Sequence, residues 1–113
     1  MSKPSALTTH ILDTSSGAPA EGVKVELWRI DNSGPVKVTE RFTNADGRTD
    51  TPLLTPDTFV PGRYELRFHI GTHFRGVGFL DLVPIAVRLE AGQGHYHVPL
   101  LCSPWSYATY RGS

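Results

Sequence analysis

The sequence predicts an all-β protein, an antiparallel β-sandwich of seven to eight short strands with one short helical turn. Two observations support this fold class. Apolar and polar residues alternate along most segments, which is the pattern of strands that bury one face. Clusters rich in Gly, Pro, Asn and Asp interrupt these segments at intervals of roughly ten residues, the spacing typical of sandwiches and barrels.

These turn-forming clusters divide the chain into the individual elements. The expected strands cover residues 6–13, 23–30, 36–43, 63–70, 82–90, 95–102 and 105–110. The first is rich in β-branched residues, and the later ones alternate apolar with polar positions. The turns between the strands fall at 15–19, 32–35, 44–47, 61–62, 91–94 and 103–104. In the turn at 44–47, the Asp46-Gly47 pair supplies the positive φ of a tight turn. Residues 51–61 are looser and Pro-rich, and residues 71–76 are expected to form the helical turn.

Length and composition indicate one ordinary globular domain over residues 1–113. The chain has 113 residues, of which 39% are hydrophobic and 19% charged, and its formal net charge is zero. Because Lys and Arg do not cluster, nucleic acid and anionic membranes are not expected partners. No stretch approaches the roughly 20 apolar residues of a membrane span, and the start of the chain lacks an apolar signal region, so a cytoplasmic protein is expected. Cys102 follows two leucines and is expected to be a buried structural thiol.

Three histidines lie off the apolar faces of their strands. Alternation puts Leu7, Thr9 and Ile11 on one face of the first strand, so His10 points to the other. The same argument separates His95 and His97 from the apolar residues of the strand at 95–102. Arg48 directly follows the Asp46-Gly47 turn, where a hairpin tip presents it at a rim. Such a group could act as an acid/base site with an oxyanion-stabilising cation.

Other interpretations of the same residues stay open. Isolated histidines on an outer sheet face are often only solvated. His95 and His97, two residues apart, could form half of a zinc site, although the sequence supplies no Cys, Asp or Glu at a matching spacing nearby. His69 and His73 are expected to be surface or packing histidines. The sequence contains neither a phosphate-binding glycine loop nor a Gly-x-Ser-x-Gly nucleophile motif.

Several motifs resemble one enzyme family. Residues 7–14 (LTTHILDT) with 17–20 (GAPA) look like the N-terminal signature of the 5-hydroxyisourate hydrolases, the enzymatic branch of the transthyretin family. Further matching motifs are NADGR at 44–48, GRYEL at 62–66, HYHVPLL at 95–101 and TYRGS at 109–113. The resemblance covers nearly the whole chain, and the ending Tyr-Arg-Gly-Ser is highly specific.

The resemblance implies a reaction and an assembly. The reaction is the cofactor-free and metal-free hydrolysis of 5-hydroxyisourate to 2-oxo-4-hydroxy-4-carboxy-5-ureidoimidazoline, in urate catabolism. The assembly is a homotetramer, a dimer of dimers, with sites in a channel where two dimers meet. By motif, the resemblance assigns catalytic roles to His10, Arg48 and His97. It assigns substrate binding to His10, Arg48, Tyr110, Arg111 and Ser113.

Two departures and two alternative functions accompany the resemblance. The family commonly has serine where this chain has Ala108, and leucine where it has Cys102. A transthyretin-like protein that binds a small ligand without catalysis is the alternative function. Such a binder would not need His10, Arg48, His97 and Tyr110 together. A zinc-dependent hydrolase using His10, His95 and His97 is a further alternative.

Overall fold

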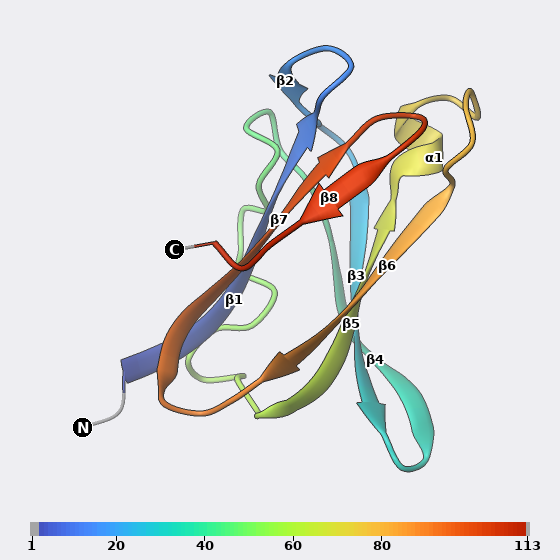
Figure 1. Ribbon diagram of the computed structural model, residues 1–113. Helices are drawn as coiled ribbons and strands as arrows, with labels where there is room; N and C mark the ends of the chain where they lie inside the picture. The colour runs from blue at the N-terminus through green and yellow to red at the C-terminus, as the bar shows by residue number, and fades with distance from the viewer. Residues whose placement is uncertain (1–2, 113) are drawn as a thin grey trace.

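The alternating segments form eight strands and one short helix in a computed structural model that describes residues 3–112 (Figure 1). The elements are β1 (Lys3–Asp13), β2 (Ala18–Pro19), β3 (Lys24–Asp31), β4 (Gly34–Phe42), β5 (Gly62–His69), α1 (Ile70–His73), β6 (Leu82–Leu89), β7 (Gln93–Cys102) and β8 (Tyr107–Thr109). In the part of the chain that the structure describes, no helix has the length and apolar character needed to cross a membrane.

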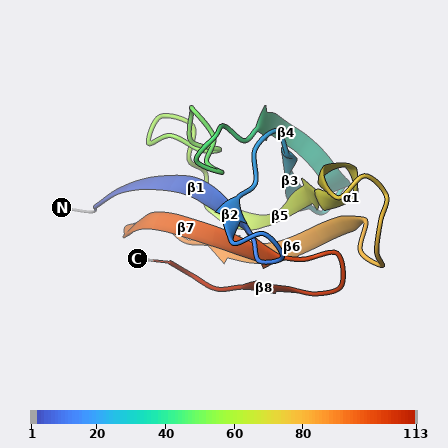
Figure 2. The same cartoon turned by 90° about the horizontal axis from the view of Figure 1, so that it is seen from above.

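The strands form two four-stranded sheets that pack face to face. One sheet has the order β2-β1-β7-β8 and is called here the β1 sheet; the other has the order β4-β3-β5-β6 and is called the β3 sheet. Figure 2 shows the two layers from above, with β8 running along the outer side of β7. This arrangement confirms the predicted all-β sandwich with one short helical turn.

One strand pair differs from the predicted antiparallel pattern. β1 and β7 are parallel, whereas the other paired strands of the two sheets are antiparallel. Alternation predicts which residues of a strand share a face, but it carries no information on the direction of a partner about 90 residues away. Only neighbours joined by a short turn are forced to be antiparallel, and β1 and β7 are not joined in this way.

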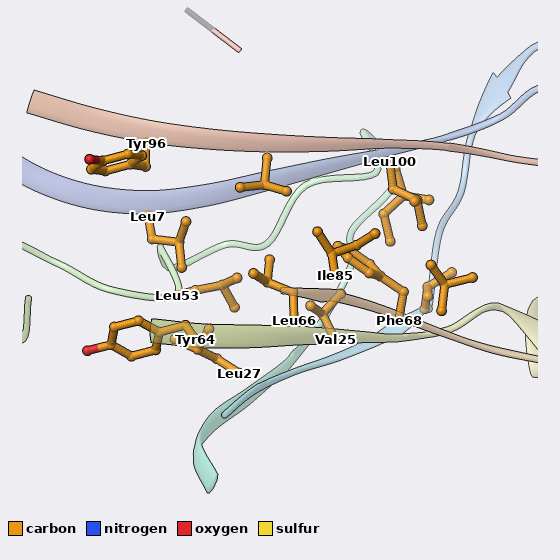
Figure 3. Close-up of a cluster of buried hydrophobic side chains, with 14 of the residues drawn as sticks. Leu7, Val25, Leu27, Leu53, Tyr64, Leu66, Phe68, Ile85, Tyr96 and Leu100 are labelled. Atoms are coloured by element: carbon orange, nitrogen blue, oxygen red, sulfur yellow. The ribbon is translucent and has the colours of Figure 1, made fainter. Parts of the chain in front are cut away.

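The core lies between the sheets and follows the predicted alternation. Leu7 and Ile11 of β1 and Leu100 of β7 are fully buried, and they meet Leu66 and Phe68 of β5. Figure 3 shows Leu7 and Leu100 pointing inward from the β1 sheet toward Leu66 and Phe68 of the β3 sheet. Burying a side chain of this size contributes about 1.5–3 kcal/mol each relative to leaving it exposed. The opposite faces of β1 and β7 are thereby left free for polar residues.

The long connection between β4 and β5 covers the edge of β1. It was expected to be loose, yet Leu53 and Leu54 in it are only 3% and 1% exposed. The amide of Leu7 donates to the carbonyl of Leu54 (2.9 Å), and the amide of Ile11 donates to the carbonyl of Gly47 (2.9 Å). The connection therefore pairs with the β1 edge that β7 leaves open.

Cys102 has the structural role expected from its position. It is 1% exposed, and burial, with a smaller effect of the Asp13 carboxylate, raises the pKa of its thiol to about 11. The thiol is therefore protonated near neutral pH and is a poor nucleophile.

Gly47 should be intolerant of any side chain. It has φ +74°, and a Cβ placed there would lie 2.5 Å from the Ile11 carbonyl oxygen. Gly17 is the matched control, with φ +75° and open space around it. We expect Gly17→Ala to cost about 1 kcal/mol from backbone strain alone. Gly47→Ala should cost roughly 3 kcal/mol or more, because β1 must shift. Urea unfolding at fixed protein concentration measures both, and equal costs would contradict the predicted collision.

Candidate active site

The site is built on the outer face of the β1 sheet by the register of β1 and β7. Thr8 lies opposite His97, and His10 lies opposite Pro99. Because side chains alternate, Thr8, His10, His95 and His97 all point away from the core, as the sequence predicts. His10 and His97 are half-buried, and His95 is exposed.

The hydroxyl of Thr8 joins the two histidines of β7. Its Oγ1 lies 2.8 Å from Nδ1 of His97 and 2.6 Å from Nε2 of His95. The two imidazole rings are nearly perpendicular, with centroids 6.3 Å apart and an interplanar angle of 73°. One nitrogen of each ring is therefore engaged by the same hydroxyl. Among the described residues, no group of three or more His, Cys, Asp or Glu side chains has a metal-binding arrangement.

Arg48 reaches this face because of the turn that precedes it. The Oδ1 of Asn44 accepts from the amides of Asp46 (2.9 Å) and Arg48 (3.2 Å), which closes the turn around Gly47. Arg48 then forms an antiparallel bridge with His10. Since bridged residues share a face, the exposed guanidinium group lies on the histidine side of β1. The predicted location of Arg48 at a turn rim agrees with the structure.

Arg48 and the two histidines of β7 border a polar hollow of about 330 Å³. Its lining consists of Thr8, Thr9, Arg48, Thr49, His95 and His97. A volume of this size suits a small heterocycle and lies at the lower end of typical ligand pockets. Imidazoles supply proton acceptors and donors, and the guanidinium can bind a carboxylate-like or enolate-like oxygen pair.

The environment of His97 favours its neutral form. Burial is the main cause that lowers its pKa from the ordinary 6.5, and the positive charges of Arg48, His95 and His10 lower it further. Folding favours the neutral ring of His97. The stabilising contribution of this neutral ring to the free energy of unfolding is therefore fully present above pH 6.5, and it decreases as the pH falls toward the lowered pKa. His97 is therefore an available base near neutral pH.

The C-terminal segment reaches His97 through Gly112. The amide of Gly112 donates to the carbonyl of His97 (2.7 Å), and a Cβ on Gly112 would lie 2.7 Å from Cδ2 of the imidazole. Because Gly112 is opposite His97, the preceding Arg111 points to the other face. Its guanidinium lies 4.2 Å from the ring centre of Tyr96, and Nη2 donates to the Gln93 carbonyl (3.2 Å).

The remaining predicted tail residues are not brought into the polar hollow. Tyr110 is 60% exposed. It lines, with Arg111, a different and mainly apolar hollow of about 300 Å³ beside β6. Ser113 lies outside the described residues. Within one subunit, the structure thus brings together His10, Arg48 and His97, and leaves Tyr110 and Arg111 outside that group.

Two residues of this arrangement were not singled out by the sequence. Thr8 shares the outer face with His10 by alternation, but its place between two histidines depends on the register with β7. Gly112 was part of a motif without an assigned role. Its close contact with the His97 ring became visible only in the fold.

The other two histidines serve packing roles. Nε2 of His73 lies 2.9 Å from the Asp13 carboxylate, which also accepts from the backbone and hydroxyl of Ser15. Nε2 of His69 lies 3.4 Å from Glu26, on the outer face of the β3 sheet. Both are away from the polar hollow, in agreement with the expected packing role.

The fold and this histidine–arginine site define a transthyretin-like protein. The model of the HIUase/Transthyretin family matches residues 7–112. The 5-hydroxyisourate hydrolase of Deinococcus radiodurans is 48% identical over 100% of this chain and 100% of its own length. The chain belongs to the HIUase/transthyretin family.

Solved structures agree with this assignment. Klebsiella pneumoniae 5-hydroxyisourate hydrolase has a TM-score of 0.81 at 34% identity, covering 100% of this chain and 97% of that one. Sea bream transthyretin in complex with thyroxine has a TM-score of 0.87 at 26% identity, covering 95% and 94%. An (S)-allantoin synthase has a TM-score of 0.88 at 40% identity and covers 99% of this chain, which spans only 45% of that longer protein.

The lowered pKa of His97 can be measured directly. In proton NMR titrations, we expect the His97 imidazole to titrate below its ordinary value of 6.5. Arg48→Gln should raise that pKa, because it removes a nearby positive charge. Arg63→Gln, on the outer face of the β3 sheet, is the matched control and should leave it unchanged. A His97 pKa at or above 6.5, or one insensitive to Arg48→Gln, would contradict the electrostatic account.

Proposed function

We propose that this chain is a cofactor-free hydrolase that converts 5-hydroxyisourate to 2-oxo-4-hydroxy-4-carboxy-5-ureidoimidazoline, in urate catabolism. The observation that carries this proposal is the convergence of His10, Arg48 and His97 on one outer face, where Arg48 and His97 line a hollow of about 330 Å³. The proposal is also supported by the similarity to the 5-hydroxyisourate hydrolase of Deinococcus radiodurans, which is 48% identical over the full length of both chains.

The chemistry requires three functions from the site. Hydrolysis of a ring acyl–nitrogen bond needs an activated water, stabilisation of negative charge on the carbonyl oxygen, and a proton for the leaving nitrogen. His10 and His97 position and deprotonate the water, a role that suits a neutral imidazole and contributes about 10²–10⁴ in rate. The imidazolium formed in this step then gives its proton to the leaving nitrogen. Arg48 binds the ionised heterocycle and the developing oxyanion through charge-assisted hydrogen bonds.

The proposal includes a cytoplasmic homotetramer, a dimer of dimers. The hollow at Arg48 is open, and a second copy placed over the outer face of the β1 sheet would exclude water from it. Such a copy would also put tail residues Tyr110, Arg111 and Ser113 near a neighbouring hollow, where they contact the substrate. A fully active monomer in light scattering at the assay concentration would contradict this assembly.

Binding without catalysis is the alternative function. It is favoured by the similarity to sea bream transthyretin in complex with thyroxine, at 26% identity, and by the apolar hollow of about 300 Å³. A pure binder has no use for a neutral histidine base beside an arginine, so turnover separates the two functions.

The proposal predicts turnover that depends on both histidines. With 5-hydroxyisourate generated in situ by urate oxidase, the protein should accelerate the ultraviolet decay of this compound. His10→Asn and His97→Asn should each lower turnover by two or more decades, because each removes an imidazole that positions and activates the water. His69→Asn, on the outer face of the β3 sheet, is the matched control.

The outcomes of this assay separate the alternatives. The wild-type rate should survive a strong chelator; its loss would favour the zinc-dependent alternative. Near-normal turnover in one histidine variant would remove that residue from the catalytic set. No acceleration by the wild-type protein would overturn the proposed hydrolase and favour the ligand-binding alternative.

The tail should be essential for turnover but not for folding. Deleting residues 110–113 removes the Gly112 contact with His97 while leaving the last strand, Tyr107–Thr109, intact. We expect loss of activity with an unfolding midpoint close to that of the full chain. Arg63→Gln again serves as a surface control. Unchanged turnover after the deletion would show that the tail is not part of the site.

A further inference from the structure

His97 lies in an environment that disfavours the positive charge it would gain by taking up a proton. His97 is half-buried and has Arg48 and His10 near it on the same face. An imidazolium formed there is desolvated and lies close to an arginine. His95, on the same strand, is exposed, so water can stabilise a positive charge on it.

Thr8 connects these two environments at hydrogen-bond distance. Its Oγ1 is 2.8 Å from Nδ1 of His97 and 2.6 Å from Nε2 of His95. A threonine hydroxyl has one proton to donate and two lone pairs to accept with. If Nδ1–H of His97 donates to Oγ1, Nε2 of His97 keeps a free lone pair, and the hydroxyl proton can be donated to Nε2 of His95.

We propose that Thr8 is a positioning residue that holds the proton of neutral His97 on Nδ1, and that Thr8 and His95 form a relay for positive charge during hydrolysis. This inference rests on the proposed hydrolase function. It goes beyond it by giving His97 the role of the base and by assigning roles to Thr8 and His95.

Protons and charge balance in both steps of the relay, the attack by water and the cleavage of the acyl–nitrogen bond. Nε2 of His97 takes a proton from the attacking water, the Nδ1 proton moves to Oγ1 of Thr8, and the hydroxyl proton moves to Nε2 of His95. The positive charge then resides on the exposed imidazole. When the acyl–nitrogen bond breaks, Nε2 of His97 gives its proton to the leaving nitrogen and the other two protons return. The hydroxide of water ends on the acyl carbon, its proton ends on the nitrogen, and the three side chains regain their starting forms.

The variants follow from the geometry. Thr8→Val keeps the shape and the β-branched character but removes the hydroxyl, whereas Thr8→Ser keeps the hydroxyl. His95→Gln can still hydrogen-bond Thr8 but cannot accept a proton to become charged. Thr72→Val, at an exposed position of α1, is the matched control for loss of a threonine hydroxyl.

Kinetics test the relay with a pattern that general destabilisation would not give. We expect Thr8→Val to lower kcat about tenfold to a hundredfold with KM changed less than threefold, as for a lost hydrogen bond to a charged group. Thr8→Ser should recover to within about threefold of wild type, and His95→Gln should lower kcat by about threefold to tenfold. A wild-type kcat in Thr8→Val overturns the role of Thr8, and a wild-type kcat in His95→Gln overturns the relay.

A second measurement is independent of turnover. In ¹⁵N-labelled protein above the pKa of His97, NMR should show its proton on Nδ1 in the wild type and in Thr8→Ser, and a shift toward Nε2–H in Thr8→Val. The same tautomer in Thr8→Val as in the wild type overturns the positioning role, even if that variant is unstable. Absence of any hydrolysis by the wild type would instead reject the proposed function, and the tautomer measurement would still decide the role of the Thr8 hydroxyl.

Discussion

The parallel pairing of β1 with β7 is the constraint on which the rest of the site depends. The register that places Thr8 opposite His97 also places Leu7 and Ile11 on the opposite, buried face of β1. A slip of one residue would exchange the faces of β1, burying His10 and exposing Leu7 and Ile11. The apolar core therefore fixes the relative positions of polar residues that it does not touch. In this way, stability and site geometry share a single cause.

β1 also organises the charge of the site because both of its edges are paired. β7 occupies one edge and brings His95 and His97, while the connection between β4 and β5 occupies the other and brings Arg48. The imidazoles of β7 and the guanidinium of Arg48 therefore approach one another from opposite edges of β1, above its outer face. Burial is the main cause that lowers the pKa of His97, and the nearby positive charges lower it further. The same positive charges suit the hollow to an ionised, electron-rich ring.

The sequence predicted the strands and their faces better than their partners. Alternation placed His10 and His97 off the core correctly, because side-chain direction depends only on the local backbone. It did not predict the parallel direction of β7, nor that Leu53 and Leu54 seal the edge of β1, because both depend on contacts between distant segments. For the same reason, the bridging position of Thr8 could not be predicted from its own neighbours. The choice among the histidines came from motif resemblance, which carries information that alternation lacks.

The close contact at Gly112 shows why the tail and the base are linked. A Cβ at this position would enter the space of the His97 ring, so the backbone of the tail lies directly against the imidazole edge. With Thr8 on Nδ1 and Gly112 against Cδ2, the ring is restrained on two sides, and rotation about its bonds is limited. A ring restrained in this way loses less conformational freedom when a substrate binds, which is the physical benefit of preorganisation. The tail thus contributes to the site through its backbone. This accounts for a glycine at position 112, which is packed against the ring of His97.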